Sequence, residues 1–317
     1  MKNRLLLALS LLVASASVFA QYPSRPIRLI VGFPPGGSAD PIARIVGNAL
    51  AERLGQPVLV ENKPGADSAI AADLTAKSLP DGYTIFYGSN SAMTAAVALR
   101  KTPPYDALAD FSQISLLGRA TVILYAHAGV PATSTAELVA HARANPGKLN
   151  YGTGNPLSIL DAQQMMNIAG IQMVHVPYKG EGPAIPDLVA GRVQLSFLSA
   201  TSAIALAKEG RLRPLFVLLD QRSPLLPDVP TAAEAGMGGI TVRHWAGLFG
   251  PAKIPREIVA RLNRETNAVL ARPDVREQLQ RQGFVVQGST PEELAALNRA
   301  DLALWKQMVR EAGIVLE

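Results

Sequence analysis

Cysteine is absent from the sequence, although the chain is 317 residues long. A secreted protein without cysteine cannot be held together by disulfides, so it must depend on a large hydrophobic core. Hydrophobic residues make up 48% of the chain, which is enough to supply such a core. At this length the core is most simply divided between two domains.

Long hydrophobic runs are also absent beyond the N-terminus. No segment after residue 20 has the roughly 18 uninterrupted apolar residues that a membrane-spanning helix needs. Residues 1–20 are typical of a secretory signal peptide: Lys2 and Arg4 are positive, Leu5 to Val13 are apolar, and Val18-Phe19-Ala20 forms a small-residue cleavage site. We therefore expect cleavage after Ala20, no lipid anchor, since no cysteine precedes that point, and a soluble mature chain.

Strong charge of either sign is lacking. The formal net charge is +5, and Lys2 and Arg4 of the expected leader contribute to it. Lysine and arginine are scattered along the chain, and no basic–aromatic cluster forms a stripe for nucleic acid. We therefore expect no nucleic-acid partner, and the charge indicates at most a mild preference for small anions.

Signatures of metal, nucleotide and catalytic sites are missing. The histidines lack metal-ligand spacing, so no metal is expected and each is interpreted as structural: His127, His141, His175 and His244. Neither a phosphate-loop Gly-Lys-Ser/Thr nor a dinucleotide fingerprint occurs, so no cofactor is expected. The segment around Ser38 lacks the final glycine of a nucleophile elbow, and no histidine base can be assigned to it. We expect no enzymatic activity.

A strand, a glycine loop and a helix start follow one another early in the mature chain. Ile27–Val31 is an apolar run typical of a buried strand, and it leads into the glycine- and proline-rich segment Gly32–Gly37. Ser38 or Asp40 is the predicted N-cap of the next helix, with Pro41 at its first position. Free backbone N–H groups and the helix dipole favour an anion at such a point.

Strands and helices continue to alternate along the chain, as in a parallel α/β sheet. In such sheets ligands bind beyond the carboxyl ends of the strands. Strands are predicted at Val58–Val60, Thr84–Tyr87, Val122–Tyr125, Leu149–Tyr151, Met173–Val176, Val193–Phe197 and Leu215–Leu218. Helices are predicted to end near Lys77 and Ala144 and to span Ser158–Ile168, Pro183–Ala190, Pro255–Leu270, Asp274–Gln282 and Pro291–Ala312; Leu248–Pro251 is interpreted as a crossing back to the first domain.

A second glycine loop repeats the arrangement of the first. Gly152–Pro156 follows a short strand and opens a helix at Ser158. Either loop alone is consistent with a simple tight turn. Two such loops, one in each predicted domain, favour a ligand cleft between the domains. Phe33 is expected either in the core or stacked on the ligand, and Asp67 and Asp161 on exposed helix surfaces with ligand contact as the alternative.

Several motifs in one order resemble a known family. They are Phe33-Pro-Pro-Gly-Gly-Ser-Ala-Asp40, Glu61-Asn-Lys-Pro-Gly65, Asp81-Gly-Tyr-Thr84, Asn145-Pro-Gly-Lys-Leu-Asn-Tyr-Gly152, Val176-Pro-Tyr-Lys-Gly180, Leu226-Pro-Asp-Val-Pro-Thr231 and Gly247-Leu-Phe249. Each motif is weak alone, but the ordered set, spanning Tyr22 to Ile314, is specific. The chain resembles the Bug (TctC-like) substrate-binding proteins of tripartite tricarboxylate transporters.

The resemblance implies a periplasmic protein, and a monomer is expected. It implies a two-domain α/β Venus-flytrap fold, with parallel-rich sheets and helices on both faces. Residues 21–122 and 247–317 would form domain 1, and residues 123–246 domain 2. The domains would close over a small carboxylate, held by backbone N–H groups and waters, and deliver it to membrane permease components.

The resemblance and the loops together select a set of candidate ligand-binding residues. They are Phe33, Gly36, Gly37, Ser38, Ala39, Asp40, Asp67, Ser68, Ser89, Asn90, Gly154, Asn155, Ser158 and Ser199.

The sequence departs from the usual family pattern at four places. The second loop, Gly152–Pro156, is shorter than the usual glycine-serine run. Ile159 stands where many relatives have histidine, Asp67-Ser68 replaces a glycine pair, and Leu198 stands where relatives often have aspartate. Loss of that aspartate argues against an amino-acid ligand unless Asp67 substitutes for it. The expected ligand is a small mono- or dicarboxylate, aromatic ones included. Alternative functions are a ligand sensor for a signalling receptor and a periplasmic serine hydrolase using Ser38.

Overall fold

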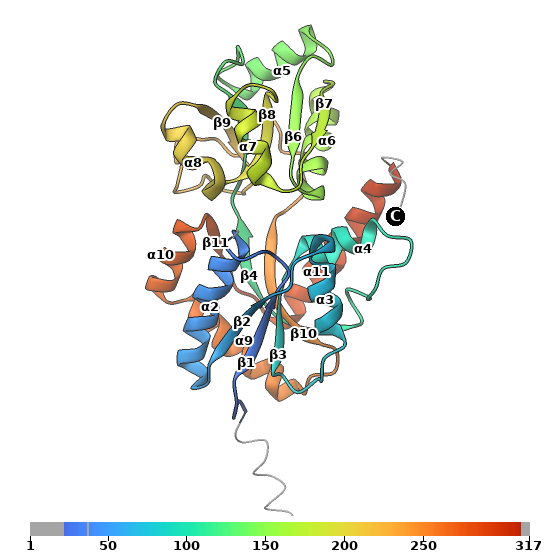
Figure 1. The fold of residues 1–317 in the computed structure, drawn as a ribbon, viewed down its shortest axis with the longest axis vertical. Helices are drawn as coiled ribbons and strands as arrows, with labels where there is room; N and C mark the ends of the chain where they lie inside the picture. The colour runs from blue at the N-terminus through green and yellow to red at the C-terminus, as the bar shows by residue number, and fades with distance from the viewer. Residues whose placement is uncertain (1–21, 37, 312–317) are drawn as a thin grey trace, which may run out of the picture.

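The chain forms two lobes, each built around one β-sheet, in a computed structural model that describes residues 22–36 and 38–311. Figure 1 shows the blue, cyan, orange and red segments in the lower lobe and the green and yellow segments in the upper lobe. The expected signal peptide, its cleavage point after Ala20, and Gly37 lie outside the described residues. Within the described part, no helix combines the length and apolar character that crossing a bilayer requires.

The lower lobe contains a six-stranded mixed sheet with the order β11-β4-β10-β3-β1-β2. Parallel pairing is confined to β1 with its neighbours β2 and β3, whereas β10, β4 and β11 pair in antiparallel fashion. The expectation of a parallel-rich sheet therefore holds only around β1. The strands are β1 (Ile27–Val31), β2 (Val58–Asn62), β3 (Thr84–Ser89), β4 (Phe111–Ala120), β10 (Trp245–Pro251) and β11 (Phe284–Val286).

The upper lobe contains a five-stranded sheet with the order β7-β6-β8-β5-β9. It is also mixed, because β6 runs parallel to β7 and β8 while β5 is antiparallel to β8 and β9. Its strands are β5 (Val122–His127), β6 (Asn150–Thr153), β7 (Val174–Pro177), β8 (Leu195–Ser199) and β9 (Leu212–Val217).

Helices cover both sheets. The lower lobe has α2 (Ala39–Leu54), α3 (Ala69–Ala76), α4 (Ala96–Ala98), α9 (Arg256–Leu270), α10 (Pro273–Arg281) and α11 (Pro291–Glu311), with a 3-10 turn η2 (Ala66–Ser68) and a π-helical turn η3 (Ser91–Ala95). The upper lobe has α5 (Thr135–Ala144), α6 (Pro156–Ala169), α7 (Glu181–Val189) and α8 (Ala200–Lys208). The prediction that Pro41 is the first residue of this helix was wrong. The helix α2 begins at Ala39, so Pro41 is its third residue.

The apolar run of β1 is explained by burial on both faces of the sheet. Ile27, Leu29 and Val31 enter one core with residues of α2 and α9, whereas Ile30 enters a second core with residues of α3 and α11. Successive side chains of a strand point to opposite faces, so a strand with a core on each side must be apolar throughout. This sandwiching fixes the position of the glycine loop that follows β1.

The lobes are joined where the chain passes from β4 to β5 and back into β10. The N–H of Ala120 donates to the carbonyl of His244, and the N–H of Thr121 donates to the carbonyl of Gly283, each at 2.7 Å. The two crossing segments and the start of β11 are thus tied side by side. Leu248–Pro251 proves to be part of β10, a strand between β3 and β4, and not simply a crossing.

Candidate functional site

A cavity of about 140 Å³ lies between the two lobes. The carboxyl ends of β3 and β8, the first residues of α2 and α6, and the crossing segments all contribute to its wall. The described residues that line it are Phe33, Ser38, Ala39, Ile42, Tyr87, Ser89, Asn90, Ser91, Ala120, Thr121, Val122, Asn155, Leu157, Glu181, Ser199, His244, Trp245, Ala246, Gln282, Gly283 and Phe284.

The described part of this wall contains no lysine or arginine. Its one carboxylate belongs to Glu181 and its one imidazole to His244. An anionic ligand would therefore be held by neutral donors, namely hydroxyl, amide and backbone N–H groups. Helix starts supply such donors together with a favourable dipole.

Asp40 stabilises the first glycine loop through hydrogen bonds to its carboxylate. Its carboxylate accepts hydrogen bonds from the Gly36 N–H at 3.2 Å, from Arg44 Nε at 3.1 Å and from Asn62 Nδ2 at 3.0 Å. Burial alone would raise the pKa of Asp40, but these hydrogen bonds outweigh it and hold the pKa below its usual value. Asn62 also donates to the Phe33 carbonyl at 3.0 Å, so both ends of the loop are fixed.

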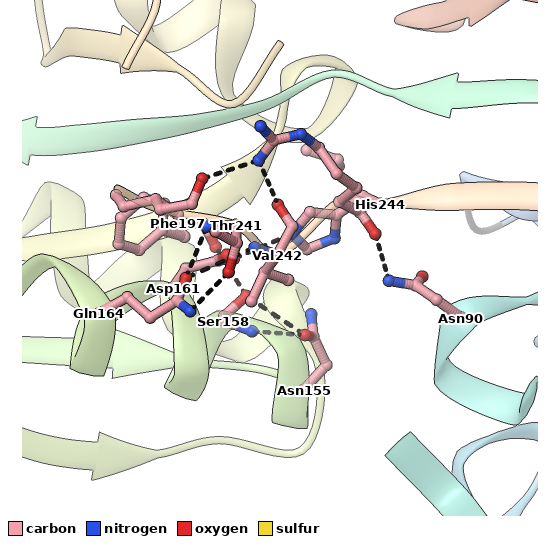
Figure 2. Close-up of polar contacts among 12 residues, drawn as sticks. Asn90, Asn155, Ser158, Asp161, Gln164, Phe197, Thr241, Val242 and His244 are labelled. Carbon is pink, nitrogen blue, oxygen red and sulfur yellow. Dashed lines mark hydrogen bonds and ion pairs between the residues drawn. The ribbon is translucent and has the colours of Figure 1, made fainter. Parts of the chain in front are cut away.

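The end of β3 brings three polar residues to the cavity. Ser89 is 8% exposed, and its buried hydroxyl has no partner among the described residues. A buried hydroxyl without a hydrogen bond is costly, so this group is poised to bond with a ligand or water. Asn90 donates from its side chain to the Arg243 carbonyl and thereby ties β3 to the crossing segment (Figure 2). Ser91 follows at the start of η3.

The second loop is held by its own cap. Asn155 is the N-cap of α6, and its Oδ1 accepts from the Ser158 N–H at 3.0 Å. The hydroxyl of Ser158 lies 3.3 Å from the same oxygen and 3.4 Å from the Phe197 carbonyl, so it holds α6 against β8. A Cβ at Gly154 would lie 2.3 Å from the carbonyl carbon of Gly180, so only glycine permits this close approach of two backbones.

One face of α6 is polar and packs against the crossing segment, as Figure 2 shows. Asp161 is fully buried, and its Oδ2 lies 2.9 Å from His244 Nε2. Gln164, one turn further, donates to the Thr241 hydroxyl at 2.9 Å and accepts from the Thr241 N–H at 2.9 Å. The prediction that Asp161 lies on an exposed helix surface was wrong, because the crossing segment covers that surface.

The candidate residues divide between the cavity wall and its supports. Seven line the cavity: Phe33, Ser38, Ala39, Ser89, Asn90, Asn155 and Ser199. Gly36, Asp40, Gly154 and Ser158 support the two loops as described above. Ser68 donates to the Gly32 carbonyl at 3.0 Å and so packs behind the first loop. Asp67 lies beside it, exposed as expected, in the 3-10 turn η2, where its backbone is left-handed with φ 55°.

Two substitutions singled out in the sequence lie away from the cavity wall. Leu198 is completely buried in the apolar core of the upper lobe, and Ile159 does not line the cavity. Neither residue therefore decides whether a ligand amino group finds a carboxylate partner.

Sequence reasoning missed Glu181, Thr121, Trp245 and Phe284 of the cavity wall. Glu181 was within reach, because Gly180 ends the loop after β7 and Glu181 opens α7, the same strand–glycine–helix arrangement as in the two recognised loops. Thr121 lies between β4 and β5, and Trp245 and Phe284 begin β10 and β11, so their positions depend on pairing between β4, β10 and β11. No local pattern marks them.

The described residues form no cluster of histidine, aspartate and glutamate suited to a metal ion. The hydrogen bonds found in residues 22–36 and 38–311 include none between Ser38 and a histidine, and His244 is paired with Asp161.

Comparisons with known proteins all point to the same family. Residues 42–314 match the family described as "Tripartite tricarboxylate transporter family receptor". Protein BugT of Bordetella pertussis is 34% identical over 325 residues, covering 99% of each chain.

Solved structures agree with this match. Periplasmic binding protein BugD is 29% identical with a TM-score of 0.80, covering 93% of this chain and 100% of its own. Rpa4515 of Rhodopseudomonas palustris, solved with adipate, is 32% identical with a TM-score of 0.82, covering 92% and 98%. MatC of the same organism, solved with malate, is 32% identical with a TM-score of 0.77, covering 91% and 100%.

These similarities extend over nearly the whole chain and include both lobes, between which the cavity lies. They agree with the resemblance seen in the ordered motifs, with the two-sheet α/β fold, and with the expectation of binding without catalysis. The chain belongs to the TctC (Bug) family of periplasmic solute-binding receptors of tripartite tricarboxylate transporters.

Proposed function

We propose that this receptor captures a small carboxylate in the cavity between its lobes and delivers it to the permease components of a tripartite transporter. The observation that carries the proposal is the cavity wall, whose described residues present helix starts, serine hydroxyls and the unpartnered Ser89 hydroxyl, and include no lysine or arginine. Such a wall would hold a carboxylate by directed hydrogen bonds. The relatives solved with adipate and malate support a carboxylate as the ligand class.

The residues proposed to contact the ligand are the seven candidates on the wall. Gly36, Asp40, Ser68, Gly154 and Ser158 are proposed to hold the loops in place. We also propose residues 21–122 with 247–317 and residues 123–246 as the two domains; the membership of the two sheets supports this division. Export to the periplasm by cleavage after Ala20 remains a proposal, which N-terminal sequencing of the secreted protein tests.

Thermal melting against a panel of small carboxylates and amino acids tests the ligand class. The protein is first refolded from urea to remove any co-purified ligand. A ligand at a hundred times its Kd adds about 2.7 kcal/mol of stability, which raises the Tm by roughly 5 °C for a chain of this size. We expect such a shift with at least one carboxylate and a smaller one in Ser89→Ala.

Ser78→Ala is the matched control, because the Ser78 hydroxyl is bonded to the Leu74 carbonyl on α3 and lies outside the cavity wall. It should keep the full ligand-induced shift. A panel in which no compound that carries a carboxylate shifts the Tm contradicts the proposed function.

A further inference from the structure

Glu181 places a negative charge on the wall of a cavity proposed to bind an anion. It is the first residue of α7 and lines the cavity from the upper lobe. No lysine, arginine or histidine of the described chain forms an ion pair with it. Its charge is therefore balanced by hydrogen bonds alone.

Those hydrogen bonds come from the start of another helix. Both carboxylate oxygens of Glu181 accept from the Ser199 N–H at 3.2 Å, and Oε2 also accepts from the Ser199 hydroxyl at 2.8 Å and the Ser202 hydroxyl at 2.7 Å. Ser199 is the N-cap of the nine-residue helix α8. One backbone N–H and two hydroxyls are the donors that a ligand carboxylate would use, and the positive end of the helix dipole would add to its attraction.

The lower lobe offers a different environment. There the Ser89 hydroxyl is buried without a partner, and no acidic side chain of the described residues lines that side of the cavity. The two sides are thus unequal: one retains an unused hydrogen-bonding group, whereas the other has its donors taken by the chain's own carboxylate.

We infer that Glu181 fills the second carboxylate subsite of this receptor, so that its ligand is a small monocarboxylate whose far end donates hydrogen bonds. This inference rests on the proposed function and narrows its ligand class. The ligand carboxylate binds on the Ser89 side, and a hydroxyl or ammonium group at the other end meets Glu181. A second ligand carboxylate there would face a like charge and find its donors occupied.

A purely structural role for Glu181 makes a different prediction. If Glu181 only caps α8, its replacement changes stability but leaves the preference among ligands as it was. Ligand selectivity, and not stability, therefore separates the two roles.

The test is calorimetric titration of the mature protein with two matched sets of probes. One set is adipate, 6-hydroxyhexanoate and 6-aminohexanoate, and the other is succinate, 4-hydroxybutanoate and 4-aminobutanoate. In the wild type we expect a hydroxy or amino acid to bind at least about tenfold more tightly than the dicarboxylate of equal length. In Glu181→Ala this order should reverse, because the donors at Ser199 and Ser202 become free.

Two further variants control the experiment. Glu181→Gln removes the charge but keeps a side chain of the same size, so it should weaken the discrimination even if Glu181→Ala folds poorly. Glu257→Gln alters an exposed glutamate in the first turn of α9, outside the cavity wall, and should bind like the wild type.

Tighter binding of the dicarboxylate by the wild type overturns the inference and leaves the proposed function standing. An unchanged order of preference in both Glu181 variants overturns it as well. If none of the six probes binds, the inference is again overturned, and the proposed function is then judged by the wider melting panel.

Discussion

At the scale of single residues, the buried pair of Asp161 and His244 joins α6 to the crossing segment. Burial raises the pKa of the Asp161 carboxyl, and the neighbouring His244 and Arg243 act in the opposite direction. A buried carboxylate is tolerated when a partner lies at 2.9 Å, as His244 does here. The pair thus couples the upper lobe to the route by which the chain returns to the lower one.

Replacement of His244 should destabilise the protein in a way that depends on pH. Asp161 in the unfolded chain titrates at about 3.9, and its folded pKa is raised, so its contribution to stability is present below that value and lost as the pH rises through the folded pKa. His244→Ala removes one lowering influence. We expect a loss of about 3 kcal/mol in the free energy of unfolding by urea at pH 8, and a smaller loss at pH 4.

The control is the double variant Asp161→Asn with His244→Ala, which leaves no buried carboxyl to ionise. Its stability relative to the wild type should vary less between the two pH values. An equal deficit for His244→Ala at pH 4 and pH 8 would show that the carboxyl of Asp161 is not the group responsible.

At the scale of elements, the site depends on helices that begin next to glycine loops. The start of α6 and the loop before α7 approach so closely that Gly154 and Gly180 meet backbone to backbone. This approach sets where Glu181 lies relative to Asn155 on the same cavity wall. A change in the spacing of these two loops should therefore reach the ligand directly.

Gly154→Ala is expected to force the two loops apart. The added Cβ would meet the backbone of Gly180, which cannot rotate away as a flexible side chain can, so a cost of about 1–3 kcal/mol is expected. Ligand affinity, measured by calorimetry, should fall about tenfold or more. Gly182→Ala is the control, since a Cβ there meets nothing within 4 Å; equal effects of both substitutions would contradict this account.

Patterns within short stretches of sequence predicted many of the helices and strands. The other strands depend on pairing with strands that are far away in the sequence. Ser134 and Glu137 have the spacing of a capping box, and the Ser134 side chain accepts from the Glu137 N–H. The β1 strand, the helix after the second loop and the C-terminal helices were also predicted from their patterns. By contrast, β4 and β10 lack clean alternation, and the two glycines of β10 give it the composition of a turn.

The same distinction explains the site. The two glycine loops were found because the residues that form them are contiguous in the sequence. Asp161 was misjudged because residues 241–244 cover it, and nothing near Asp161 in the sequence indicates that cover. Its position with Asn155, Ser158 and Gln164 at three-residue intervals was the available signal, since such spacing places polar side chains near one face of a helix.

At the scale of the whole molecule, two sheets joined by paired crossing segments provide a cavity that closure can seal. The hydrogen bonds from Ala120 to His244 and from Thr121 to Gly283 keep the crossings together, so the lobes are expected to move about this connection as units. A ligand that touches both lobes favours the closed population to the extent that it binds that state better. Glu181 in the upper lobe and Ser89 in the lower lobe would contact the two ends of one ligand.

The most direct test is the crystal structure of the mature protein with the carboxylate that gives the largest shift in the melting panel. We expect the ligand between the lobes, with a carboxylate oxygen within hydrogen-bond distance of the Ser89 hydroxyl. A second cavity of about 510 Å³, lined by Arg119, Asp220 and Arg276 among others, lies next to the crossing segments. A ligand bound there, with the cavity at Ser89 empty, would contradict the central claim.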